Sequence, residues 1–206
     1  MIAAERRSLA DTLSGFDTKQ WTSASLCRGW TVHDVAAHVL MPLVTSLPRI
    51  MVAMAGSGFN FDRANVKLTA GVARRSNAEL VTGLRTNAEH RFTPPGMGPA
   101  APLTDLIVHG QDIRRPLRID HAIDHEHLAR SLAFVAGKPR GFVTKSLVDG
   151  IRFEATDLDW AGGDGAVARG TGEAILLTMV GRRIAVADLE GPGVDTLRGR
   201  FGLGRV

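Results

Sequence analysis

The chain has 206 residues, of which 44% are hydrophobic, and its formal net charge is +4 at neutral pH. This length and composition predict one sizeable domain, or one ordinary domain with a small second one. No run of 18 apolar residues occurs, so we expect no membrane-spanning segment and no membrane partner. The N-terminal segment lacks the pattern of a secretory signal, and we expect a cytoplasmic protein. A single cysteine, Cys27, excludes an internal disulfide and a zinc finger built from cysteines.

The positive charge is a weak argument for a nucleic-acid partner. Basic residues are scattered along the chain, and the densest groups are pairs such as Arg74-Arg75 and Arg182-Arg183. The sequence contains neither a long basic run nor a platform of interleaved aromatic residues. Arginine accounts for 21 of the 25 basic residues, a bias typical of a GC-rich genome. We therefore expect no nucleic-acid partner.

The first quarter of the chain shows helical patterns. An apolar stripe at helical spacing predicts a helix over residues 2–15. After a loop, Thr31 and Asp34 have the spacing of a capping box, which predicts the start of a second helix. We expect this helix to be kinked near Pro42 and to continue to about Pro48 or beyond.

Further helices are predicted up to residue 135. Residues 61–75 are expected to be helical, and a capping box opens a helix over about 76–90. The proline- and glycine-rich segment TPPGMGPAAP, residues 93–102, predicts a loop. Helices are then expected over about 103–115, ended by the following proline, and over 124–135, capped by its first residue.

After residue 138 the pattern changes to a mixture of strand and helix. IRFEATDLDW (151–160) alternates like a strand, with a change of phase that predicts a bulge. AGGDG (161–165) predicts a hairpin turn, GEAILLTMVGRR (172–183) a short helix and IAVADLEG (184–191) another strand. The predicted domains are a helical bundle over 1–140 and a small α+β domain over 141–206.

Three side chains on two of the predicted helices have the chemistry of a zinc site. Asp105 and His109 are four residues apart in LTDLIVHGQDI, so on a helix both project from one face. His38 lies in the other helix, within VHDVAAHVLM. Two imidazoles and one carboxylate fill three corners of a tetrahedral site and leave the fourth for water or substrate, as in catalytic zinc sites. The apolar character of the 103–115 helix predicts partial burial of the carboxylate, which then needs a partner or a metal.

Other interpretations of these residues remain open. A histidine such as His38 is, by itself, more often a structural residue of the core. Asp112 is a candidate fourth ligand, an acceptor for an imidazole N–H or a cap, and we favour the last two roles. Cys27 is interpreted as a buried structural thiol, with a nucleophile as the alternative.

Two further motifs are given structural interpretations. His121, His125 and His127 in HAIDHEH form a denser histidine cluster, but this polar segment lacks apolar neighbours and favours a solvated helix start. GGDGAVARG has no lysine and no strand-to-helix context, so it does not predict a phosphate-binding loop.

Three segments together resemble one known family. CRGWTVHDVAAH (27–38), LTDLIVHGQDIRRPL (103–117) and DWAGGDGAVARGTGEAILLTMVGRR (159–183) are similar to the mycothiol-dependent maleylpyruvate isomerase family of DinB-like metalloproteins. The resemblance extends over nearly the whole chain. It implies a mainly α fold, with an antiparallel four-helix bundle that holds a divalent metal, usually zinc. A small α+β domain like the sterol-carrier proteins is expected to follow the bundle.

The same resemblance implies which residues bind the metal. The family's ligands are a histidine after GWTV, then a glutamate and a histidine four apart, and these positions match His38, Asp105 and His109. Aspartate is a competent zinc ligand, but it is one methylene shorter than the glutamate of the family. The family's isomerase also uses an arginine in its second domain. Four arginines are candidates and none is assigned: Arg152, Arg169, Arg182 and Arg183.

Two functions follow as hypotheses. In the first, the protein is a zinc enzyme with mycothiol as thiol cosubstrate, which the metal binds and deprotonates. The thiolate then adds to an electrophilic small-molecule substrate, and the outcome is cis–trans isomerisation or S-transfer. In the second, the protein is a non-catalytic, metal-stabilised module that binds an apolar ligand or a protein partner. We expect a monomer or a homodimer.

Overall fold

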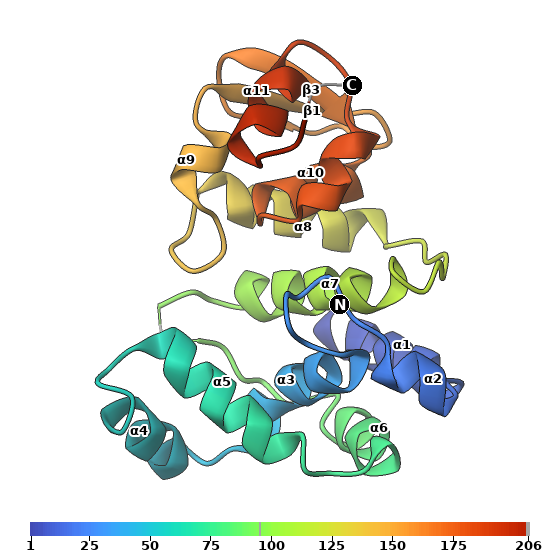
Figure 1. Ribbon diagram of the computed structural model, residues 1–206, viewed down its shortest axis with the longest axis vertical. Helices are drawn as coiled ribbons and strands as arrows, with labels where there is room; N and C mark the ends of the chain where they lie inside the picture. Colours follow the sequence, from blue (N-terminus) through green and yellow to red (C-terminus); the bar gives the residue numbers. More distant parts are fainter. Residues whose placement is uncertain (95, 205–206) are drawn as a thin grey trace. The chain divides into compact units, whose positions relative to one another are not determined.

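The computed structural model describes residues 1–94 and 96–204 and is mainly helical, with one small sheet near the C-terminus (Figure 1). This confirms the coarse fold class predicted from the sequence. The chain divides into two compact units. The first unit comprises Met1–Gly98 and Asp105–His121, and the second comprises Pro99–Thr104 and Ala122–Val206.

Helices make up the first unit. They are α1 (Ile2–Ser14), α2 (Thr18–Thr22), α3 (Val32–Val44), α4 (Leu47–Ala55), α5 (Phe61–Val72), α6 (Asn77–Thr86) and most of α7 (Ala100–Arg114). Helix α1 packs against α6, and α3 packs against both α5 and α6. Their apolar faces share one core, which includes Leu13, Leu40 and Leu84 and, from α7, Leu106 and Ile113.

Both predicted capping boxes are confirmed. Thr31 Oγ1 accepts a hydrogen bond from the Asp34 N–H at 3.2 Å, and Asp34 Oδ2 accepts one from the Thr31 N–H at 2.9 Å. Ser76 and Glu79 make the same pair of contacts at the start of α6. Each box satisfies backbone donors that a helix leaves without an internal partner. The start of α3, which carries His38, is therefore set by local sequence.

The predicted kinked helix through Pro42 is wrong. Pro42 lies inside α3, which ends at Val44, and α4 begins after Ser46 with its direction changed by 117°. Ser46 is in an extended conformation, and Pro48 occupies the first turn of α4, where a proline is well tolerated. No single helix among the described residues is long and apolar enough to span a membrane, and α3 with α4 passes that test only as this bent pair.

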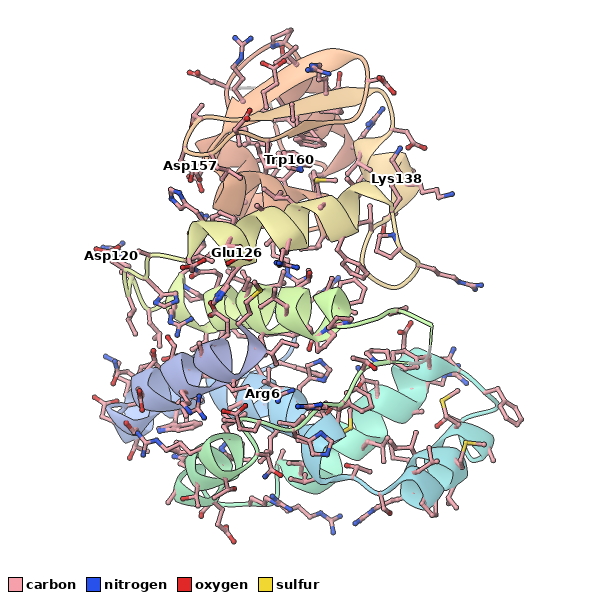
Figure 2. The ribbon with its side chains drawn as sticks, turned by 180° about the vertical axis from the view of Figure 1, so that it is seen from behind. Arg6, Asp120, Glu126, Lys138, Asp157 and Trp160 are labelled. Carbon is pink, nitrogen blue, oxygen red and sulfur yellow. The ribbon has the colours of Figure 1, made fainter. Side chains whose placement is uncertain are left out.

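Other boundaries differ from the sequence predictions. Helix α2 is not among the predicted helices, although Asp17 and Gln20 form a capping box at its start. Helix α6 ends at Thr86, and α7 begins at Ala100, inside the segment predicted to be a loop. Beyond α6 the chain is held by Arg6 of α1, which is 2% exposed and donates to the backbone oxygens of Ala88 at 2.8 Å and His90 at 2.6 Å (Figure 2).

The second unit combines helices with the sheet. Its elements after α7 are α8 (His125–Ala136), α9 (Lys145–Val148), β1 (Ile151–Ala155), β2 (Ala161–Gly162), β3 (Ala166–Gly170), α10 (Gly172–Met179), the 3-10 helix η1 (Arg183–Asp188) and α11 (Gly193–Arg200). The strand order is β2-β1-β3, with β1 antiparallel to β2 and parallel to β3. Helix α10 packs against α8 and η1, and its residues Gly172 and Ala174–Met179 are buried.

Three predictions for this unit are wrong. The strand over 151–160 ends at Ala155 without the expected bulge, and IAVADLEG forms η1 in place of a strand. The segment AGGDG is no hairpin turn, because its first two residues are β2 and the next three lead across to β3. Gly163 and Gly165 have positive φ, and a Cβ on either would lie 2.3 Å from a backbone oxygen of residues 150–151. Only glycine is sterically allowed at these two positions of the segment that connects β2 to β3.

Helix α8 belongs to the second unit by its contacts, whereas the sequence predicts a boundary near residue 140. The division into domains 1–140 and 141–206 stays a prediction.

Candidate metal site

His38, Asp105 and His109 lie together in the first unit. One ligand atom from each lies within 4.8 Å of the other two. His109 Nε2 is 3.4 Å from Asp105 Oδ1, and the two imidazole ring centres are 4.7 Å apart with planes at 82°. Helix α3 contributes the first residue and α7 the other two, from one face, as the four-residue spacing predicts. The structure thus brings together the residues selected from the sequence, and their role as metal ligands stays a prediction.

Each imidazole has a polar neighbour at its Nδ1 atom. His109 Nδ1–H donates to Asp112 Oδ2 at 2.9 Å, and His38 Nδ1 lies 3.4 Å from Thr69 Oγ1 of α5. The Trp30 ring packs edge-on against His38, with ring centres 5.2 Å apart. In metal sites the second nitrogen of a ligating histidine usually has such a partner, which fixes the ring and its tautomer. Both rings can therefore present Nε2 to one ion.

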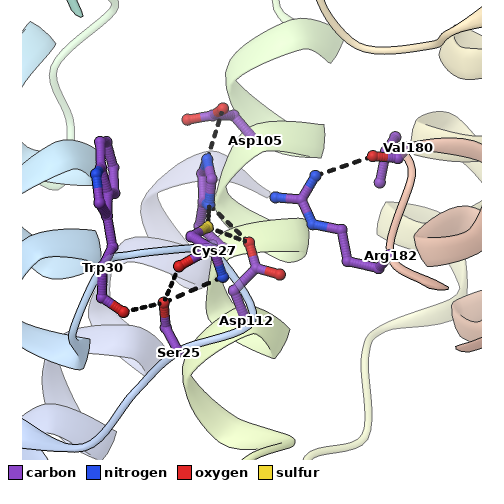
Figure 3. A network of polar contacts seen from close by, with 8 residues as sticks. Ser25, Cys27, Trp30, Asp105, Asp112, Val180 and Arg182 are labelled. Atoms are coloured by element: carbon purple, nitrogen blue, oxygen red, sulfur yellow. Dashed lines mark hydrogen bonds and ion pairs between the residues drawn. The ribbon is translucent and has the colours of Figure 1, made fainter. Parts of the chain in front are cut away.

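Asp112 is completely buried and lies at the centre of a polar network (Figure 3). Besides His109, its Oδ2 atom accepts a hydrogen bond from the Cys27 thiol at 3.1 Å. These contacts offset part of the cost of burying a carboxylate. The predicted role of Asp112 as an acceptor for an imidazole N–H is confirmed.

The loop before α3 brings Cys27 to this network. The Leu26 N–H donates to the Asp112 backbone oxygen at 3.0 Å, and Ser25 Oγ links the Cys27 N–H to the Trp30 carbonyl (Figure 3). Cys27 is half-buried, and its sulfur is 3.6 Å from His109 Nδ1. No local sequence pattern predicts this contact, because 82 residues separate the two side chains.

Cys27, His109 and Asp112 form a second group with metal-ligand chemistry, again within 4.8 Å of one another. This group would use Nδ1 of His109, which already donates to Asp112. The Nε2 side of His109 therefore fits an ion better than the Nδ1 side.

Within this site, the surroundings shift the pKa of the His109 imidazole. Burial by itself lowers the pKa of this imidazole, because it disfavours the charged form. The negative charge of Asp105 and the hydrogen bonds with Asp105, Asp112 and Cys27 outweigh burial, so the His109 pKa lies well above its ordinary value. Without a metal, Asp105 and Asp112 therefore favour the protonated form of the imidazole. A cation bound at Nε2 would replace that proton.

The donor set fits a zinc-like ion. Imidazole nitrogen and carboxylate oxygen are ordinary zinc ligands, and three of them leave a position for a further ligand. The Asp105 side chain is 36% exposed and that of His109 is 12% exposed, so one side of the group meets solvent.

Several of the other candidate residues have structural contacts. Asp124 caps α8 by accepting from two backbone N–H groups, so His125 and His127 occupy a helix start, as predicted, whereas His121 precedes the helix and is half-buried. Arg152 and Arg169 each contact Glu154 at 2.8 Å, and these hydrogen bonds lower the pKa of that half-buried carboxyl. Arg182 donates to the Val180 carbonyl at 2.9 Å (Figure 3). None of these contacts assigns a substrate-binding arginine.

Comparison with known proteins identifies the N-terminal part of the chain. Residues 2–91 match the model of the mycothiol maleylpyruvate isomerase N-terminal domain. This part of the chain is therefore similar to that domain. For these residues, which include CRGWTVHDVAAH (27–38), the match confirms the resemblance predicted from the sequence. The matched range includes Cys27 and His38, whereas Asp105 and His109 follow it along the chain.

Two solved structures are similar to the chain. One is a crystal structure of the mycothiol-dependent maleylpyruvate isomerase, at 18% sequence identity and a TM-score of 0.47. The other is a histidine-to-alanine mutant of that enzyme, at 19% identity and a TM-score of 0.46. In both cases the similarity covers 88% of this chain and 90% of the other. No curated protein sequence matches the chain.

Proposed function

We propose that this protein is a divalent-metal-dependent enzyme that uses mycothiol as its thiol cosubstrate. His38, Asp105 and His109 would hold the ion, and their nitrogen and oxygen donors favour Zn²⁺. The observation that carries the proposal is the convergence of these three side chains within 4.8 Å, in a unit whose residues 2–91 match the mycothiol maleylpyruvate isomerase N-terminal domain.

The ion would supply a positive charge that holds a thiol as its thiolate. The chain's own residues prepare the position. Asp112 fixes the His109 ring through a 2.9 Å hydrogen bond, and Thr69 lies beside Nδ1 of His38. The partly exposed Asp105 leaves the site open on one side.

The proposed substrate is a small electrophile to which the thiol of mycothiol adds. Isomerisation results if the adduct rotates and expels the thiol, and S-transfer results if the adduct is released. A carboxylate substrate would need a cation, and the arginines of the second unit are the candidates.

We further propose that the first unit is a DinB-like four-helix bundle and that the C-terminal part is a sterol-carrier-like domain. We also keep three predictions from the sequence: the protein is a monomer or homodimer, it is cytoplasmic, and it has no nucleic-acid partner.

A second candidate function is a metal-stabilised binding module without turnover. Asp105 favours it, because this carboxylate is one methylene shorter than the glutamate of the resembled family. In such a module the metal is structural, and its removal should lower the free energy of unfolding greatly. In an enzyme, removal should abolish thiol-dependent turnover while much of the fold persists.

The deciding experiment is a thermal-shift measurement with zinc and mycothiol, each alone and both together. We expect mycothiol to raise the melting temperature only when zinc is present, because the thiol binds through the ion. His38→Ala serves as the control that should remove the effect of both. A zinc-dependent shift with no further change on adding mycothiol would exclude the enzyme and leave the binding module.

A further inference from the structure

Exposed hydrophobic side chains concentrate on α4 and the first half of α5. Of the eight large hydrophobic side chains that are exposed among the described residues, six lie between residues 47 and 66. This apolar patch consists of Leu47, Met51, Val52, Phe59, Phe61 and Val66. Helix α4 buries only Ala53, so most of its apolar surface has no cover within the described structure. Such a concentration marks an interaction surface.

The turn between α4 and α5 presents an aromatic side chain to solvent. Phe59 is 73% exposed and has a φ of 58°, and Gly58 before it has a φ of 62°. The left-handed region is unfavourable for a bulky residue and is found where the surroundings or a function require it. Here the conformation places a large apolar group at the tip of the turn, although a polar residue would be expected there.

A cavity with a positive rim adjoins the patch. It has a volume of about 230 Å³, lies between the end of α3, α4 and α5, and shares Val52 with the patch. Arg49, Lys67 and Arg75 line it, and none of its lining residues is acidic. Arg49 and Lys67 make no hydrogen bond or ion pair with any other described residue. The cavity therefore places unpaired positive side chains next to apolar ones such as Val52.

The charge of this region equals that of the whole chain. Residues 47–75 contain five basic side chains and one acidic one, a net charge of 5 − 1 = +4, and the protein carries +4. A second copy of the chain is a poor occupant, because a symmetric contact would bring the same cations together. The complementary occupant is both anionic and apolar.

We propose that this α4–α5 surface binds the surface of a membrane that contains anionic phospholipids. Arg49 and Lys67 at the cavity contact the headgroup phosphates, and the apolar patch enters the boundary with the acyl chains. Basic and apolar groups on one helical surface are the usual features of interfacial binding. The ligand residues of the candidate metal site do not line the cavity, so this proposal does not depend on the proposed function.

The test is co-sedimentation of the full-length protein with phosphatidylcholine vesicles, with and without phosphatidylglycerol. We expect binding to the anionic vesicles only, weakened by salt. The double variant Phe59→Ser/Phe61→Ser keeps the charge and should bind at least about tenfold more weakly, since each buried Phe contributes substantially. Arg49→Glu/Lys67→Glu should also bind weakly.

The matched control is Arg183→Glu/Ile184→Ser in the second unit, where an exposed arginine precedes an isoleucine that is 51% exposed. It should bind like the wild type. Melting curves and zinc content report whether each variant is folded, and Met51→Ser replaces the double variant if that one is unfolded.

Three results would overturn the proposal. The first is no binding of the wild type to anionic vesicles at low salt. The second is equal binding by the patch variant and the control, which would indicate non-specific attraction of a basic protein. The third is a wild-type dimer in sedimentation velocity that the patch variant abolishes, because the patch would then be a contact between two copies.

Discussion

Asp105 is the residue at which the chain departs from the family that it resembles. Its Oδ1 atom is 3.4 Å from His109 Nε2, a separation compatible with two ligand atoms of one ion. If Asp105 ligates the metal, Asp105→Ala should lose most of the bound zinc after dialysis against a weak chelator. Asp105→Glu should keep or increase it, because the longer side chain restores the reach of the family's ligand. Full zinc occupancy in Asp105→Ala would rule out direct ligation.

His109 predicts how the metal-free protein responds to pH. Its folded pKa is raised well above the ordinary value, because Asp105 and the hydrogen bonds outweigh burial. This interaction therefore stabilises the fold fully below about pH 6.5, the unfolded pKa, and its contribution is lost as the pH rises through the folded pKa. Urea unfolding across this range should show the decline, and His109→Gln should flatten it. A decline of the same size in His109→Gln would assign it to other groups.

At the scale of single residues, the sequence predicts the ligand candidates but not their surroundings. The spacing of Asp105 and His109 on one helix is sufficient to place them side by side. Cys27 and Thr69 cannot be placed in this way, because their contacts depend on how distant segments pack. Thr69 lies 31 residues from His38, and no local pattern links the two.

Local capping determines where the helix of His38 begins. Thr31→Ala removes the side-chain acceptor of the Asp34 N–H and should lower the free energy of unfolding by about 1 kcal/mol. Because fraying of α3 also disturbs His38, zinc affinity should fall as well. The matched control is Ser76→Ala, which removes the same box from α6. It should lower stability by a similar amount and leave zinc affinity unchanged; equal zinc loss in both variants would refute the link between α3 and the site.

Elements with strong local signals are predicted well from the sequence, and the others are not. Capping boxes locate α3 and α6, whereas the break between α3 and α4 depends on packing that Pro42 alone does not reveal. IAVADLEG has the composition of a strand, but it forms η1, which packs against α10, and Glu190 near its end makes an isolated β-bridge with Arg169. Short apolar segments do not decide between strand and helix by themselves.

For the whole molecule, the sequence predicts a mainly helical chain with a small mixed C-terminal part, and this is confirmed. The lack of a spanning segment is the basis on which the sequence predicts no membrane partner. That criterion concerns only segments that cross a membrane. It does not detect the apolar patch on α4 and α5, because its residues come to lie beside the positively charged cavity only when the chain folds. Sequence periodicity cannot show that α4 leaves its apolar side uncovered.

The central claim is that one ion, held by His38, Asp105 and His109, binds the thiol of mycothiol. The most direct test is the absorption spectrum of the cobalt-substituted protein, in a Cys27→Ser background that removes the chain's own thiol. Adding mycothiol should produce a sulfur-to-cobalt charge-transfer band, and His38→Ala should prevent it. A protein that retains cobalt and shows no such band at saturating mycothiol would contradict the claim.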